Sequence, residues 1–424
     1  MLLFILYTRL SDLGLGSQGV QAVDPKGLSS IAQGCLLALA ALIFARRTRA
    51  GGARGRAAGA GPWMAMWLYL AVLYGSSVWA TDEAAASGQA ASLLKNLLIV
   101  YVIAEIFDTP RAQRLAIWSL LGAGVLMASL TMIQAATHTF ENTYLGMAQA
   151  PVRQIVGMDN SFRSSGPIGD PNFYALILAV LVPLALLRIR DEQRPILRLV
   201  ATATTVLLLG AIALTYSRGA LVTLAIVAML LVPMARVRAR HLVLALVLLA
   251  PLATLAPAAY WQRIATLAQG DGAISSRAGS QQVALTLFDE HPLGGVGANN
   301  YTATYLPVAL RLNVPGAAEN PHNLYLAIAA ETGLAGLLTF GGAMLLVLRA
   351  AWRRRQAAWQ GGDRLSEGLA TACVLALLTY LVGVIFLPIA YPRYLWVLVG
   401  LTLAVASPTR APVRRSVPAI ANLA

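Results

Sequence analysis

The sequence predicts an all-α integral membrane protein with about 12 transmembrane helices and a large helical loop between two late spans. Hydrophobic residues make up 58% of the 424 residues and charged residues only 12%, and the mean hydropathy is +0.67. Apolar runs of membrane-spanning length recur along the chain, with most arginines in short clusters between them. Such a composition is typical of a chain with lipid as its solvent. It outweighs the chain length, which alone would suggest about three soluble domains.

The predicted spans are apolar runs of about 17–25 residues, the length that crosses a bilayer. The first and weakest lies near 1–15. The others lie near 29–45, 62–80, 90–107, 115–135, 173–187, 197–215, 219–235, 242–259, 323–348, 366–389 and 394–408.

The distribution of arginine predicts which side each loop faces. The formal charge is +14, and 30 of the 32 basic residues are Arg. If both termini are cytoplasmic, 22 arginines fall in short loops and the tail on the cytoplasmic side, as the positive-inside rule requires. A basic chain can also bind nucleic acid, with the stretch 46–56 as the candidate here, but this pattern favours a cytoplasmic loop and no nucleic-acid partner.

We interpret residues 1–424 as a single polytopic membrane domain with two long loops on the outer side, 136–172 and 260–322. Neither loop is of low complexity. The stretch SFRSSGPIGDPNFYA at 161–175 is rich in turn residues, which give a loop a fixed shape. In the second loop, Ser276 is expected to cap a helix that runs to about Glu290, where Pro292 and several glycines follow. Residues 81–90 are expected to form a short acidic loop on the outer side.

Three arginines on the outer side are candidate ligands for an anion. Arg163 lies in the turn-rich stretch, Arg218 in the very short connection TYSRGA, and Arg277 in the expected first turn of the loop helix. Guanidinium is suited to bidentate phosphate recognition, and a helix N-terminus favours an anion, so three such groups would fit a diphosphate. The alternatives are a snorkelling arginine for Arg218 and solvated or structural arginines for the other two.

His322 is the candidate general base. It lies in the sequence ENPHN, where Asn320 is expected to cap a membrane helix, Pro321 to occupy its first position, and His322 its first turn. The positive end of a helix disfavours imidazolium and would keep the ring neutral. The alternative is a histidine that only caps the helix or sits at the interface. Glu331 lies nearly opposite on the expected helix, so it is interpreted as structural rather than as the partner of His322.

The sequence indicates neither a metal site nor a cofactor. His291 follows Asp289 and Glu290, but three consecutive residues diverge around a helix and do not form a ligand set. We therefore expect chemistry that uses no metal.

The motifs RSSGPIGDPN, LTYSRGA, SSRAG with FDEHPLGGVGANNY, and HNLYLAIAAETGLAGLL occur in this order between about residues 160 and 340. Together they resemble the O-antigen ligase and polymerase superfamily. The resemblance implies a GT-C-like glycosyltransferase of the bacterial inner membrane, with a multi-pass fold and a periplasmic active site in the large loop and its neighbours. Where some ligases have two histidines in tandem this chain has Pro321 and His322, so a role for the first histidine is not carried over.

The resemblance also implies partners and roles. The donor would be a glycan on undecaprenyl diphosphate, held by Arg218 and Arg277 with Arg163 as a helper. His322 would be the base at the acceptor hydroxyl, with Asn323, Tyr216 and Asn320 as supporting residues. The reaction would be an inverting, metal-independent transfer.

Among the members of this superfamily the sequence favours an O-antigen ligase, which transfers the glycan onto lipid A–core in lipopolysaccharide biosynthesis. An outer loop of about 60 residues, without a further soluble domain, is the reason. O-antigen polymerases, exopolysaccharide polymerases and protein O-oligosaccharyltransferases remain alternatives. A transporter or flippase is a further alternative, but it would call for paired repeats and mid-membrane ionisable groups, for which only Lys95 and Glu331 are candidates.

Overall fold

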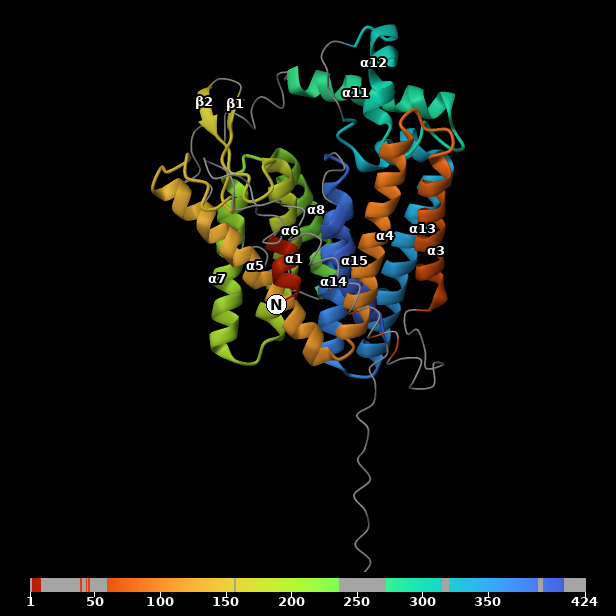
Figure 1. The fold of residues 1–424 in the computed structure, drawn as a ribbon. Coiled ribbons are helices and arrows are strands. Elements are labelled where there is room, and N and C mark those ends of the chain that lie inside the picture. The colour runs from red at the N-terminus through yellow and green to blue at the C-terminus, as the bar shows by residue number, and fades with distance from the viewer. Residues whose placement is uncertain are drawn as a thin grey trace, which may run out of the picture.

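The computed structural model describes residues 2–8, 59–155, 158–235, 272–314, 320–387 and 392–407, with isolated positions 39, 43 and 45. The predicted spans near 242–259 and, apart from those three positions, near 29–45 lie outside the described residues. What is described is a bundle of helices with smaller elements gathered at one end (Figure 1).

The bundle contains ten of the described helices, and two more helices lie with a hairpin at what we call the cap end (Figure 1). Those of the bundle are α1 (Leu2–Thr8), α3 (Ala60–Ser76), α4 (Glu83–Ile106), α5 (Pro110–Ala136), α6 (Pro171–Asp191), α7 (Pro195–Ala213), α8 (Arg218–Ala235), α13 (Leu324–Gln360), α14 (Arg364–Gly383) and α15 (Pro392–Ala406). The elements at the cap end are α11 (Gly272–Glu290), α12 (Tyr301–Arg311), and the antiparallel strands β1 (Val152–Ile155) and β2 (Met158–Phe162).

The membrane character is confirmed at a coarse level. Six of the described helices are long and apolar enough to cross a membrane by length and composition, namely α4, α5, α6, α7, α13 and α14. α8 and α15 are shorter apolar helices. The expected number of about 12 spans stays a prediction. The loop 136–172 is not purely irregular, because it contains the β1–β2 hairpin.

Helix starts follow from capping side chains. The carboxylate of Asp82 accepts from the N–H of Ala85 at 2.9 Å, and that of Asp363 accepts from the N–H of Ser366 at 3.1 Å. Each cap satisfies an N–H that has no partner within the helix. Because Asp82 caps α4, the acidic loop expected at 81–90 is wrong: most of it forms the first turns of that helix.

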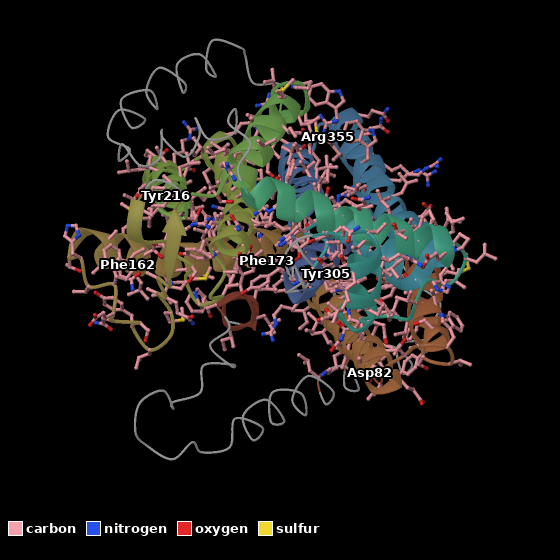
Figure 2. The ribbon with its side chains drawn as sticks, turned by 90° about the horizontal axis from the view of Figure 1, so that it is seen from above. Asp82, Phe162, Phe173, Tyr216, Tyr305 and Arg355 are labelled. Carbon is pink, nitrogen blue, oxygen red and sulfur yellow. The ribbon has the colours of Figure 1, made fainter. Side chains whose placement is uncertain are left out.

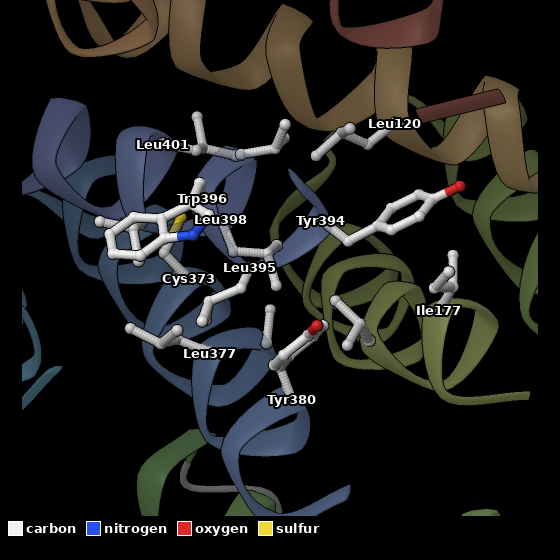
Figure 3. Packing of buried hydrophobic residues seen from close by; sticks show 14 of the residues in the cluster. Leu120, Ile177, Cys373, Leu377, Tyr380, Tyr394, Leu395, Trp396, Leu398 and Leu401 are labelled. Carbon is white, nitrogen blue, oxygen red and sulfur yellow. The ribbon is translucent and has the colours of Figure 1, made fainter. Parts of the chain in front are cut away.

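The centre of the bundle is apolar and aromatic (Figure 3). Tyr7 of α1 and Tyr394 of α15 meet edge to face, with ring centroids 5.0 Å apart. The Tyr7 hydroxyl also donates to the carbonyl of Ile177 on α6 at 2.8 Å. This contact fixes the first helix against two later ones.

At the end of the bundle opposite the cap, several arginines bind acidic side chains. Arg188 is only 1% exposed and lies 3.2 Å from Asp191 and 3.6 Å from Glu192. Arg114 of α5 donates to Glu192 through Nε at 2.8 Å, and Trp118 donates to the same carboxylate at 3.1 Å. Arg114, which the sequence marks as a topology signal, therefore also joins α5 to the end of α6 through an ion pair whose carboxylate is buried.

The helix α13 is broken at Gly333, and a loop segment fills the break. Gly333 has φ 61° and ψ −158°, a conformation open almost only to glycine. The N–H groups of Leu334 and Ala335, which the break deprives of helical partners, donate to the carbonyls of Pro292 and Leu293 at 2.8 and 3.2 Å. The backbone of the segment thus replaces the missing turn of the helix.

The same segment donates back to α13 and is held from its other side by α3. The N–H groups of Val296 and Gly297 donate to the carbonyls of Ala330 and Glu331 at 2.9 and 2.8 Å. The indole of Trp79, just after α3, donates to the carbonyl of Gly295 at 3.1 Å. We call residues 292–300 the inserted segment.

We predict that Gly333→Ala disrupts this arrangement and that Gly341→Ala on the same helix does not. A Cβ at 333 would lie 2.4 Å from the carbonyl carbon of Leu293, and the backbone conformation alone would add about 1–3 kcal/mol of strain. A Cβ at 341 meets nothing within 4 Å. Thermal unfolding of the detergent-purified variants should show a Tm lower by several degrees only for Gly333→Ala. Equal Tm values would contradict the role of the break.

Candidate active site

At the cap end the turn-rich stretch 162–173 docks on the connection between α7 and α8. Arg163, 5% exposed, donates through Nε to the carbonyl of Thr215 at 2.9 Å. Its terminal nitrogen donates to the side chain of Asn172 at 3.2 Å, and the N–H of Ser164 donates to the carbonyl of Leu214 at 3.2 Å. Figure 2 looks down on this end and marks the segments by Phe162, Phe173 and Tyr216. Two motifs far apart in sequence are thereby fixed side by side.

A small pocket, which we call the arginine pocket, lies where this junction meets α11 and the end of α14. Its polar lining comes from Asn172, Ser217, Thr223 and Arg277. The rest of the lining is apolar or glycine: Leu176, Gly219, Ala220, Gly383, Phe386 and Leu387. Arg163 therefore reaches the pocket through Asn172, whose side-chain oxygen accepts its hydrogen bond.

Arg277 lies in the second turn of α11, because the helix begins at Gly272. The expectation that Ser276 caps this helix is wrong, whereas its end at Glu290 is confirmed. A serine marks a helix start only where the chain before it is not helical, and Ala273 and Ile274 are ordinary helical residues. The helix end therefore adds less to anion binding than the sequence suggested, and the guanidinium itself remains the main feature.

Arg218 and Tyr216 flank the same connection. Arg218 is the first residue of α8, half-buried, between Ser217 and Gly219 of the pocket lining. Tyr216 has φ 52°, an uncommon value for a residue with a side chain, and burial raises the pKa of its hydroxyl. The connection is tightly built, since the hydroxyl of Thr215 accepts from the N–H of Ser217 at 3.2 Å.

His322 lies immediately before α13 rather than in its first turn. The cap is Asn323, whose side chain accepts from the N–H groups of Tyr325 and Leu326 at 2.9 and 3.2 Å. The expectation that the exposed Asn320 caps the helix is therefore wrong. His322 itself has φ 47°, a left-handed conformation that turns the chain into the helix.

The charges around His322 come from two other segments. Burial lowers the pKa of the half-buried imidazole, and the positive charge of Arg277 lowers it further, while the carboxylate of Asp170 acts in the opposite direction. Asp170 caps α6, with Oδ1 accepting from the N–H groups of Asn172 and Phe173 at 2.8 and 2.9 Å. The imidazole thus lies within electrostatic reach of both an arginine and a carboxylate.

The structure accordingly places His322 within electrostatic reach of Arg277, with Arg163 bonded to Asn172 of the pocket and Arg218 between two lining residues. Asp170, Asn172 and Ser217 were not singled out from the sequence. Asp170 had a recognisable signal, because Asp followed by Pro and then an apolar run is typical of a helix start. Its proximity to His322, 152 positions along the chain, had none.

Glu331 is occupied away from His322. It lies on α13 next to the break, and its carboxylate accepts from the backbone N–H groups of Asn299 and Tyr301. The acid thus helps to hold the inserted segment, in agreement with the structural interpretation. Within the described ranges no group of three or more His, Cys, Asp or Glu residues could hold a metal ion. The expectations of no metal and no cofactor stay predictions.

A family model described as O-antigen ligase matches residues 203–341. This match supports membership of the O-antigen ligase superfamily. The match runs from α7 to α13, so it contains Arg218, Arg277, His322 and the inserted segment. Arg163 and Asp170 lie outside the matched stretch. No curated protein matches the sequence significantly.

We predict that His322 titrates below its ordinary pKa of 6.5 and that its two charged neighbours move this value in opposite directions. A nearby cation disfavours imidazolium, so Arg277→Gln should raise the pKa. Asp170→Asn should lower the pKa, and because Asn is an equally good helix cap the fold of α6 should be kept. With four histidines in the chain, NMR of histidine-labelled protein can follow each ring. Replacement of Arg311, which pairs with Glu290 on the surface, is the control. An unchanged pKa of His322 in Arg277→Gln would show that the charge of Arg277 does not act on the imidazole.

Proposed function

We propose that this protein is an O-antigen ligase, which transfers a polymerised glycan from undecaprenyl diphosphate to lipid A–core in the bacterial inner membrane. In this proposal residues 1–424 form one multi-pass domain with both termini in the cytoplasm. The cap end faces the periplasm, with loops 136–172 and 260–322 on that side. The reaction is inverting and needs no metal.

The observation that carries the proposal is the position of His322 within electrostatic reach of Arg277, both in the stretch that matches the family. A pocket that holds Arg277, Asn172 and Ser217 offers a cation and neutral hydrogen-bond donors to a diphosphate. Arg218 adjoins it at the start of α8, where helical N–H groups also favour an anion. Arg163 supports the proposal as a residue that orients Asn172.

The chemistry requires one proton transfer and one substitution at carbon. The acceptor oxygen attacks the anomeric carbon of the donor from the face opposite the diphosphate, and the bond from that carbon to the diphosphate oxygen breaks. His322 takes the hydroxyl proton on an imidazole nitrogen and later returns it to water. The leaving undecaprenyl diphosphate departs with the electron pair, and the arginines stabilise the charge it gains.

The donor would also strengthen the base. The charge of Arg277 lowers the pKa of His322, and a bound diphosphate carries the opposite charge. The anion offsets the effect of Arg277, so the imidazole becomes more basic when the donor is present. The carboxylate of Asp170 stabilises the imidazolium that forms during transfer. Proton uptake is thereby linked to occupation of the donor site.

We predict that purified protein transfers the glycan from an undecaprenyl-diphosphate donor to lipid A–core in the presence of a metal chelator. His322→Ala should lower kcat by about 10²–10⁴-fold, the usual contribution of one positioned base. Gel mobility of the lipopolysaccharide measures the product. Full activity of His322→Ala would remove the base from the mechanism, and lengthening of the donor without transfer to lipid A–core would instead identify a polymerase.

Donor binding tests the arginines separately from the base. Arg277→Ala and Arg218→Ala should each raise the Kd for undecaprenyl diphosphate about tenfold or more, since charge-assisted hydrogen bonds contribute about 1.5–3 kcal/mol. Arg311→Ala removes an exposed cap-end arginine paired with Glu290, and it should leave the Kd unchanged. A Kd equal to that of the unsubstituted protein in all three variants would rule out an arginine clamp on the diphosphate.

A further inference from the structure

A second cavity lies inside the bundle, between α3, α4, α13, α14 and α15, under the inserted segment. We call it the bundle cavity. It is lined at its upper end by Leu324 and Val384, whose N–H and carbonyl are joined by a 3.0 Å hydrogen bond, and by Ala298 of the inserted segment. Leu324 follows His322 by two residues, so the cavity begins directly behind the candidate base.

The end of α14 separates this cavity from the arginine pocket. Gly383 and Phe386 line the arginine pocket, whereas Tyr380 and Val384 line the bundle cavity. His322 is close to this partition in sequence, because Leu324, two residues later, donates its N–H to the carbonyl of Val384. His322 lines neither pocket itself, but it adjoins this partition through Leu324.

One face of α4 presents polar side chains to the bundle cavity. Gln89, Ser92 and Asn96 are spaced three and four residues apart, so they share one side of the helix, and all three line the cavity. Asn96 is only 7% exposed. Within the part of the chain that the structure describes, the side-chain amides of Gln89 and Asn96 have no hydrogen-bond partner. Neither amide is among the fully buried unpartnered atoms of the described residues, so both are accessible and offer donors and acceptors to a ligand in the cavity.

The remaining lining indicates which ligand. Tyr69 and Trp396 contribute aromatic surface, and the carboxylate of Glu331 lies at the same cavity, while no lining residue among those described is Arg or Lys. A carboxylate in a lining that contains no cation repels phosphate and diphosphate. Amides, a carboxylate and aromatic rings together suit hydroxyl groups on a compact ring with apolar faces. The lining thus fits a neutral sugar.

We propose that the bundle cavity is the acceptor subsite, where the terminal neutral sugar of the core oligosaccharide binds with its accepting hydroxyl toward His322. This inference rests on the proposed transferase function and deepens it. The donor diphosphate and the acceptor sugar would then approach the base from opposite sides of the end of α14, with cations on one side only. Such an arrangement would let the two substrates bind independently.

Cysteine protection tests this subsite without any turnover. In a chain with Cys35 and Cys373 replaced by Ala, Ser92→Cys should react with a methanethiosulfonate reagent. Core oligosaccharide released from lipid A–core should slow that reaction, and undecaprenyl diphosphate should not. Gly88→Cys is the matched control on α4, because a side chain there meets only open space, and its rate should not respond to either compound.

Protection at position 92 by undecaprenyl diphosphate, protection by neither compound, or a cysteine that does not react at all would each overturn the subsite. These outcomes need no enzyme activity, so they are distinct from failure of the transfer assay. In an active enzyme, Asn96→Leu should raise the KM for lipid A–core about five- to tenfold through lost hydrogen bonds, with the KM for the donor unchanged. An unchanged acceptor KM would argue against the subsite even if transfer itself is confirmed.

Discussion

The geometry of the candidate site depends on the backbone hydrogen bonds between the inserted segment and the break in α13. α11, which carries Arg277, runs directly into this segment, and α13, which begins just after His322, is the element that receives it. The hydrogen bonds across Gly333 therefore set the distance between the two functional residues. They also bring Ala298 over the bundle cavity, so one backbone junction shapes both pockets.

Around this junction the chain separates charge. Arg277 lines one pocket, and Glu331 lies at the other, its carboxylate accepting backbone N–H groups of Asn299 and Tyr301. Both groups are on elements that the inserted segment joins. The separation matters because a carboxylate in the arginine pocket would repel a diphosphate, whereas Glu331 lies outside that pocket.

Helix positions that depend on local sequence signals could be predicted from the sequence. Apolar runs predicted the helices α3 to α8 and α13 to α15, but α4 starts earlier than the run at 90–107 and α13 extends beyond 348 to Gln360; Pro and Asp explain several of the starts. Prediction failed where two local solutions compete. Asn320 and Asn323 can both cap a helix, and the later one is used because the N–H of Leu324 bonds to the carbonyl of Val384, 60 residues away. The insertion at Gly333 and the approach of Asp170 to His322 have the same long-range origin.

Because α13 starts later than expected, other groups than the helix dipole determine the pKa of His322. In a first helical turn, the helix dipole would add a fixed contribution that favours the neutral imidazole. Placed before the helix, the imidazole instead responds to burial, to Arg277 and to Asp170. Burial and Asp170 are fixed parts of the fold, whereas the field of Arg277 changes when an anion binds beside it. In the proposed reaction a bound diphosphate therefore raises the basicity of His322, and the proton acceptor gains strength once a leaving group is in place.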